Sequence, residues 1–219
     1  MKNLKKILCM FLAVALMVTS FAAVSVMAEE TETQAAETTM FPDVLKSAKY
    51  ANAVEVLNKL SIINGYPDGT FGPEKNVTRA EFAAILLRTL GMDQNLAPLE
   101  APFPDVPTDF WAAGTIDSAK RLGIITGYDD GTFGPGNNVA YEEALTMIIR
   151  AINYSNYSAP GELWYASYLE SARRLDIVKD AIGNVGNPAS RACIAQFIYN
   201  TLEVNVREND IITYQLIMD

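Results

Sequence analysis

Two arginines occupy matching positions at predicted helix starts, and their chemistry suits an anionic ligand. Arg79 follows Thr78 and Arg191 follows Ser190, and an apolar helical run comes after each arginine. The N-terminus of a helix presents backbone amides to an anion, and a guanidinium adds a planar fork of donors that fits a carboxylate. The spacing therefore indicates a carboxylate site at these helix starts, with a surface salt bridge as the alternative role for Arg79.

Two tryptophans, Trp111 and Trp164, also occupy matching positions, each near the start of another predicted helix. An indole offers a flat apolar face to a sugar ring while its N–H group can still donate a hydrogen bond. Arginine and tryptophan together supply the groups that would recognise a small acidic saccharide. A buried position in the core is the alternative for each tryptophan.

Other polar residues near these positions have structural interpretations. Thr78 and Glu81 have the spacing of a capping box, which accounts for both residues, although Thr78 is kept as a candidate ligand contact. Asp43 and Asp105, each within a Phe-Pro-Asp-Val motif, are interpreted as caps rather than as ligand contacts.

The composition excludes several classes of site. The chain has no histidine, so it cannot build a Ser-His-Asp triad or a His-ligated zinc centre. Catalysis of the glycosidase type needs a pair of acids, and no pair is singled out by its surroundings. Asp68, Asp129 and Asp130 lack the ligand spacing of an EF-hand loop, so we interpret them as turn residues. We expect no catalysis, no bound metal and no cofactor.

The candidate residues belong to a sequence repeat. Gly65–Pro73 returns at Gly127–Pro135 with eight of nine residues unchanged, and the same shift of 62 positions superimposes Phe41–Val44 on Phe103–Val106. A third unit follows with a shorter loop at Asp180–Asn184, because its shift from unit two falls from 53 to 50 positions across the loop. Such self-similarity indicates three copies of one structural unit.

Each unit is predicted to be a helix, a turn-rich loop and a second helix. In unit one, apolar residues at helical spacing run from Tyr50 to Leu60 and again from Phe82 to Leu90. Gly65 is the expected left-handed residue after the first helix, and Phe71 is expected to be buried beneath the loop. The fold class is therefore mainly α.

Unit two departs from this pattern at Ala140-Tyr141, where unit one has Thr78-Arg79. Loss of the capping hydroxyl costs about 1 kcal/mol, which a packed helix tolerates. We interpret the loss of the arginine as a change in function rather than in folding.

The two ends of the chain differ from the repeats. Residues 1–28 have the features of a secretory signal peptide, with a transmembrane helix as the alternative, and residues 29–40 form an acidic spacer expected to be mobile. Residues 204–219 alternate as an extended segment does, either as a docked tail or as the start of a missing region.

Without the signal peptide the chain carries 14 basic and 26 acidic residues, a net charge of −12. We therefore expect no nucleic acid partner and no membrane insertion after signal cleavage. The single remaining cysteine, Cys193, cannot form an internal disulfide and is expected to be buried and inert.

The repeats resemble the S-layer homology repeat of bacterial surface proteins. The matching motifs are Phe103–Val106, Gly123–Gly127, Gly65–Pro73 and Thr78–Glu81, and the resemblance covers about residues 41–202. It implies a pseudo-threefold helical bundle of three repeats, with the third one divergent. We place these repeats at residues 41–92, 103–154 and 160–203.

The resemblance also implies a ligand. Such repeats hold a protein on the cell wall by binding a secondary cell-wall polysaccharide, often one that carries a pyruvate ketal, in grooves between neighbouring units. The motif arginine and a tryptophan of the first helix contribute, which indicates Arg79, Arg191, Trp111 and Trp164. If each groove takes its arginine from one unit and its tryptophan from the next, only Arg79 with Trp111 makes a complete groove, between units one and two.

The sequence therefore predicts a secreted, non-catalytic module of the cell wall or cell surface that binds an anionic wall polysaccharide, with other surface-layer proteins as further partners. The alternative is a surface adaptor, or a fragment of a structural S-layer protein, that acts through protein–protein contacts.

Overall fold

The computed structural model describes residues 37–92, 98, 100–154 and 163–204. Within them the regular secondary structure consists of six α-helices, and the β-type pairings are isolated bridges, which confirms the mainly α prediction. The predicted signal peptide, most of the acidic spacer and residues 205–219 lie outside the described residues. The helices are α2 (Ala51–Lys59), α3 (Arg79–Thr89), α4 (Ala113–Arg121), α5 (Tyr141–Ala151), α6 (Ala166–Arg174) and α7 (Arg191–Leu202).

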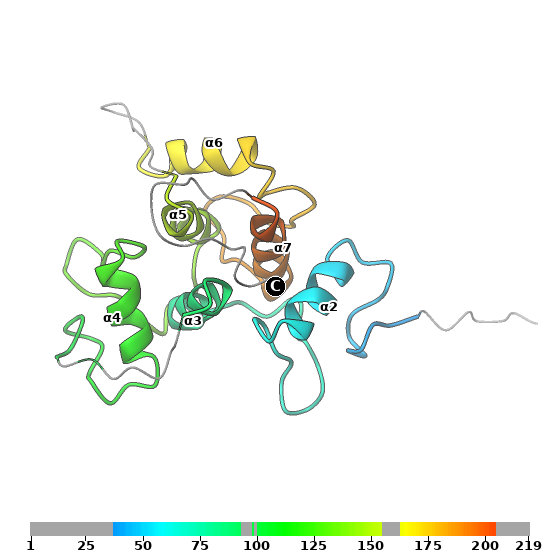
Figure 1. The fold of residues 1–219 in the computed structure, drawn as a ribbon, viewed down its shortest axis with the longest axis horizontal. Coiled ribbons are helices and arrows are strands. Elements are labelled where there is room, and N and C mark those ends of the chain that lie inside the picture. The colour runs from blue at the N-terminus through cyan, green and yellow to red at the C-terminus, as the bar shows by residue number, and fades with distance from the viewer. Residues whose placement is uncertain (1–36, 93–97, 99, 155–162, 205–219) are drawn as a thin grey trace, which may run out of the picture. The chain divides into compact units, whose positions relative to one another are not determined.

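Shorter and longer helices alternate along the chain, and the three longer ones contact one another. These are α3, α5 and α7, and they are buried along most of their lengths. Figure 1 shows α4 beside α3, α6 beside α5 and α2 beside α7. The shorter helices α4 and α6 therefore pack on the longer helix of the unit before them in the chain. α2, which belongs to the first unit, packs on α7 of the last unit, so the three units form a closed ring.

A ring of three backbone hydrogen bonds joins the segments that precede the longer helices. The Val77 N–H donates to Ala189 O at 3.3 Å, the Ala189 N–H to Val139 O at 2.9 Å, and the Val139 N–H to Val77 O at 2.9 Å. All three residues are buried, where an unpaired amide would be costly. The ring holds the three helix starts in a cyclic order, while the pseudo-threefold symmetry itself stays a prediction.

The repeated loops are held by the aspartates of the Phe-Pro-Asp-Val motifs. Asp43 accepts hydrogen bonds from the Phe71 and Gly72 N–H groups at 2.8 and 2.7 Å, and Asp105 does the same for the next loop. The prediction that these aspartates are caps is therefore wrong, because their carboxylates satisfy loop amides instead. Phe71 is fully buried, as predicted.

The left-handed residue after α2 is Ser61 (φ 57°) and not the predicted Gly65. Gly65 is required for a different reason, since a Cβ atom there would collide with the Phe41 ring and lie 2.9 Å from Thr70 O. The close approach of Phe41 therefore explains this glycine, and the helix ends earlier than the sequence pattern indicated.

The folded region begins before Phe41. The Thr39 N–H donates to Val44 O at 2.8 Å, the Lys46 N–H donates to Glu37 O at 2.8 Å, and the Lys46 and Glu37 side chains form an ion pair at 3.0 Å. The last residues of the predicted mobile spacer are thus paired with the start of unit one, because their backbone groups find partners there.

Tyr141, which stands where unit one has Arg79, has a packing role, while the interpretation that loss of the arginine changes function stays a prediction. Its ring is buried and meets Phe197 edge-on with centroids 5.0 Å apart. Gly183 lies beneath it, and a Cβ atom there would be 2.7 Å from the Tyr141 ring. Since Gly183 aligns with the buried loop residue Phe133, the tyrosine fills space that a phenylalanine fills in the other loops.

Cys193 is buried beside this contact, as predicted. Burial raises the pKa of its thiol to about 12, because the thiolate would lose its hydration. The thiol is therefore protonated and unreactive in the folded protein.

Candidate functional site

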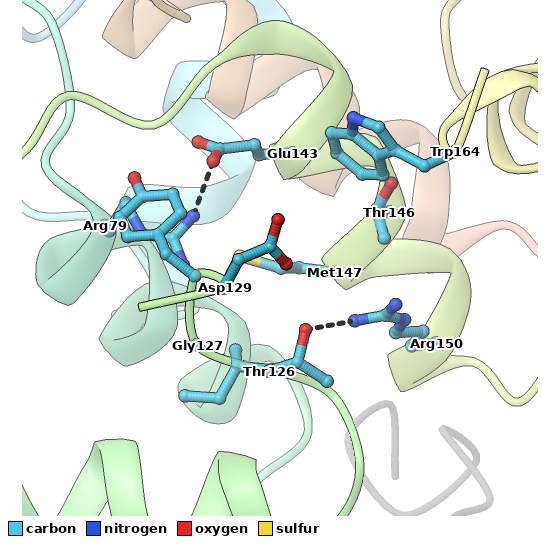
Figure 2. Close-up of a pocket in the computed structure, with 11 residues that line it drawn as sticks. Arg79, Thr126, Gly127, Asp129, Glu143, Thr146, Met147, Arg150 and Trp164 are labelled. Carbon is cyan, nitrogen blue, oxygen red and sulfur yellow. Dashed lines mark hydrogen bonds and ion pairs between the residues drawn. The ribbon is translucent and has the colours of Figure 1, made fainter. Parts of the chain in front are cut away.

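A cavity of about 410 Å³ lies against α5. Residues from four segments line it: the start of α3, the loop after α4, one side of α5 and Trp164, which lies two residues before α6 (Figure 2). We call it the α5 cavity. Its lining residues are Arg79, Ile125, Thr126, Gly127, Tyr128, Asp129, Glu143, Thr146, Met147, Arg150 and Trp164.

Arg79 is fixed in place by several partners at once. It is only 5% exposed, its Nε donates to Phe133 O at 2.8 Å, and its Nη1 lies 2.8 Å from Glu143 Oε1. The guanidinium also stacks on the Tyr128 and Phe133 rings, 4.5 and 4.8 Å from their centroids. Arg79 therefore makes a buried ion pair that joins α3 to α5, with a hydrogen bond to the loop of unit two, and not the surface salt bridge considered above.

Glu143 is positioned by half of a capping box. Its Oε2 accepts from the Ala140 N–H at 2.9 Å, which leaves Oε1 for Arg79. In unit one the full box forms, with the Glu81 carboxylate accepting from the Thr78 N–H at 2.8 Å and the Thr78 hydroxyl from the Glu81 N–H at 3.2 Å. Thr78 thus caps α3, and it is not among the residues that line the α5 cavity.

The N-terminus of α3 does not offer its amides to an anion, contrary to the expectation from the sequence. The Arg79 N–H donates to Asn137 O at 2.9 Å and the Ala80 N–H donates to Pro135 O at 3.1 Å. The Arg191 N–H of α7 is likewise bonded to Lys75 O at 2.8 Å. The neighbouring unit supplies these carbonyls, so an anion must be bound by side chains.

Both candidate tryptophans are at the surface, since Trp164 is 54% exposed and Trp111 is 61% exposed. Trp164 shares the α5 cavity with Arg79, whereas Trp111 does not line it. The predicted pairing of Arg79 with Trp111 therefore differs from the structure. The reason is the packing order, because α6 rather than α4 lies on α5 and brings its preceding tryptophan with it.

Arg150 is a cationic residue of the cavity that the sequence interpretation missed. Its Nε donates to the Tyr168 hydroxyl at 3.2 Å and its Nη1 to the Thr126 hydroxyl at 3.4 Å (Figure 2 shows the second contact). Among the described residues, no carboxylate lies within ion-pair distance of it. The sequence held one signal that could have identified Arg150, because the repeat shift of 62 positions aligns it with Arg88.

Arg191 takes the place of Arg79 against the loop of unit one. It is 9% exposed, donates from Nε to Phe71 O at 2.8 Å and from Nη2 to Asn64 O at 2.9 Å, and stacks on the Tyr66 ring. No carboxylate in the described part of the chain forms an ion pair with it. The two arginines thus share a geometry, but only Arg79 has a carboxylate partner.

Other kinds of site are not seen in the ranges that the structure describes. No cluster of three or more His, Cys, Asp or Glu side chains could hold a metal ion there. None of the helices in those ranges combines the length and apolarity that crossing a membrane requires.

Comparison with known families explains the repeated motifs. Residues 41–83 and 102–145 match the model of the S-layer homology domain. These two stretches are S-layer homology domains. The third unit lies outside the matched residues, so its assignment as a divergent repeat stays a proposal.

Similar proteins come from bacterial cell surfaces. The chain is 35% identical over 207 residues to a middle cell wall protein of Brevibacillus brevis, covering 94% of this chain and 19% of the relative. It is 35% identical over 209 residues to a surface layer protein of Brevibacillus choshinensis (94% and 18%). It is also 39% identical over 87 residues to a cellulosome-anchoring protein of Acetivibrio thermocellus (39% and 20%).

The chain spans about a fifth of the length of these relatives. The S-layer homology domains and these relatives place the protein in the secreted, cell-wall or cell-surface class and support a role in cell-wall anchoring. They indicate a non-catalytic anchoring or structural module.

Proposed function

We propose that the α5 cavity holds an anionic sugar of a secondary cell-wall polysaccharide, such as a pyruvylated one, and that this contact anchors the protein. The observation that carries the proposal is the combination of an exposed indole, Trp164, with a guanidinium, Arg150, that has no carboxylate partner in the described chain. An S-layer homology module without catalytic activity would need only such a contact to keep a protein on the wall.

The charges of the cavity favour one carboxylate and not a polyanion. Glu143 neutralises Arg79 directly, which leaves Arg150 as the cation available to a ligand. Asp129 also lines the cavity, but it is exposed, and water and salt screen its charge. A guanidinium can hold a carboxylate through two parallel hydrogen bonds, whereas the overall acidity of the chain would repel a strongly charged polymer.

The remaining lining suits the rest of a sugar. Trp164 offers an apolar face to a pyranose ring, and the hydroxyl of the exposed Thr126 can exchange hydrogen bonds with sugar hydroxyls. The Thr146 hydroxyl is buried and already donates to Glu142 O at 2.8 Å. Arg79 and Tyr128 form a preorganised floor, because the guanidinium stacks on the Tyr128 ring and is held by Phe133 O and Glu143. Such a preformed surface lowers the entropy cost of binding.

The same packing order predicts a second groove of this kind. α4 lies on α3 as α6 lies on α5, so Trp111 is expected beside α3 and the Arg191 stack. The third such position has Tyr141 and Lys49 in place of arginine and tryptophan. We therefore propose two anionic-sugar grooves in place of the single one that the sequence predicted. One lies beside Arg79 and Trp164, where Arg150 is the cation for the ligand, and the other beside Arg191 and Trp111.

Sedimentation with purified wall sacculi tests the proposal. We expect the full chain to sediment with intact sacculi and to stay in solution once the secondary polymer has been removed chemically. Sedimentation with both preparations would instead favour a wall component other than the secondary polymer. Failure to sediment with intact walls would favour the alternative, a surface adaptor or structural fragment that acts through protein contacts.

A further inference from the structure

One residue of the repeated loop differs between units one and two, and it lines the α5 cavity. Pro67 in unit one becomes Asp129 in unit two, while the other eight residues are unchanged. Both loops close through the same backbone hydrogen bond, in which the tyrosine N–H donates to the threonine O at 2.7 Å. The loop therefore folds in the same way with proline or aspartate at this position, and the fold does not require the Asp129 carboxylate.

The Asp129 carboxylate has no structural partner. The neighbouring Asp130 makes the side-chain hydrogen bonds of the turn, because its Oδ1 accepts from the Thr132 N–H at 2.9 Å and from the Thr132 hydroxyl at 2.7 Å. Within the described residues the Asp129 side chain makes no hydrogen bond and no ion pair. Figure 2 shows it turned into the α5 cavity, so its carboxylate is available to a ligand.

The α5 cavity therefore presents one cation and one carboxylate that have no partner of opposite charge in the described chain. Arg79 and Glu143 neutralise each other across 2.8 Å. Arg150 and Asp129 both line the cavity, but they do not form an ion pair with each other. A guanidinium and a carboxylate that face one cavity without touching can each take an opposite charge from a ligand. The lining thus suits a ligand that carries both a carboxylate and a cationic group.

A free amine on the sugar would supply that cationic group. An ammonium can donate a charge-assisted hydrogen bond to the Asp129 carboxylate, and the face of an exposed indole such as Trp164 attracts it as well. Water and salt screen the repulsion between Asp129 and a ligand carboxylate held at Arg150, whereas a hydrogen bond in direct contact is screened less. An N-acetylated sugar has a neutral amide at this place and loses both charge-dependent contacts.

We propose that Asp129 makes the α5 cavity selective for an amino sugar that carries a free, protonated amine together with its carboxylate, in preference to the N-acetylated form. This inference rests on the proposed function of the cavity and names the class of sugar that it takes. The groove beside Arg191 and Trp111 has Pro67 at the matching position, so we expect it to lack this preference.

Calorimetric titration of the full-length chain with muramic acid and with N-acetylmuramic acid tests the proposal. The two probes share the sugar ring and the carboxylate and differ in whether the amine is free. At about pH 6 the free amine is protonated, because amines of this kind have a pKa of roughly 8. We expect the parent chain to bind muramic acid about threefold to tenfold more tightly than N-acetylmuramic acid.

The variants show whether Asp129 causes this preference. The ratio of the two affinities should fall to about one in Asp129→Asn, which removes the charge and keeps the shape. Asp129→Pro restores the residue that unit one carries in the same turn, so it should fold, and it should lower the ratio equally. Glu74→Gln, which neutralises an exposed carboxylate outside the α5 cavity, should keep the parent ratio.

Three results would overturn the inference: no saturable binding of either probe by the parent chain, equal binding of both probes, or a preference for muramic acid that persists in both Asp129 variants. Wall sedimentation is scored separately. A parent chain that sediments only with intact sacculi, yet binds both probes equally, would keep the anchoring proposal and refute the amine preference. A parent chain that prefers muramic acid but also sediments with stripped sacculi would place the amino sugar in the remaining wall, and would refute the secondary polymer instead.

Discussion

The ion pair between Arg79 and Glu143 is predicted to be a structural clamp, so its loss should destabilise the protein. The side chains are 6% and 17% exposed, and their charged atoms lie 2.8 Å apart. Removing one partner of a buried pair costs about 3–5 kcal/mol, because the other charge stays behind. Glu143 keeps some solvent and its bond to Ala140, so we expect the lower end, about 3 kcal/mol, for Arg79→Met.

A double-mutant cycle measures the pair itself. Urea denaturation of the parent chain, Arg79→Met, Glu143→Gln and the double variant gives a coupling free energy, which we expect to be about 2 kcal/mol. Arg191→Met is the matched control, because Arg191 is stacked in the same way but does not pair with Glu143. Its cycle with Glu143→Gln should give a coupling near zero.

The clamp is refuted if the Arg79 cycle gives a coupling below about 0.5 kcal/mol, since independent sites already add within that margin. A large coupling has a practical consequence. Weaker wall binding by an Arg79 variant would then reflect partial unfolding, so the ligand contact has to be tested at Arg150.

Four further predictions follow from the same geometry. Arg150→Gln should weaken wall binding about tenfold or more, which is the value of a charge-assisted hydrogen bond, without changing the melting temperature. The control, Arg121→Gln on α4, should leave wall binding and melting temperature unchanged in the same sedimentation and melting assays. Asp105→Asn should cost about 1–3 kcal/mol in urea denaturation, because one of the Phe133 and Gly134 N–H groups then faces an NH₂ group. Gly65→Ala should cost about 1–3 kcal/mol in the same assay through its collision with Phe41, and a melting temperature equal to that of the parent would contradict this contact. Burial raises the pKa of Cys193 to about 12 from 9.0. The stability that the buried, protonated Cys193 thiol contributes is therefore complete below pH 9 and is lost as the pH rises toward 12. At pH 8 a thiol reagent should label Cys193 only in the unfolded chain.

The individual units were predictable from the sequence because their signals are local. The capping box at Thr78, the periodic apolar residues of the helices and the burial of Phe71 all depend on residues close together in the chain. The repeat shift alone also exposed the third pair of helices, which the structure shows as α6 and α7. The sequence thereby determined the helices and loops and which residue types stand at the groove positions.

Contacts between residues far apart in the chain could not be read in this way. Asp43 was taken for a cap because its partners, the Phe71 and Gly72 amides, lie in the next loop of the chain and leave no periodic signal. Arg79 was taken for a free ligand contact because its carboxylate partner is on α5. Arg150 was overlooked because a helical arginine has no distinctive neighbours in the sequence.

The tertiary structure alone decided which arginine shares a cavity with which tryptophan. Chain order suggested neighbouring units, whereas the closed ring of hydrogen bonds through Val77, Val139 and Ala189 and the packing of α6 on α5 bring Arg79 and Trp164 together. The physical reason is that sequence periodicity reports which face of a helix is buried but not which helix covers it. That choice is made by long-range packing and by the need to pair buried backbone amides.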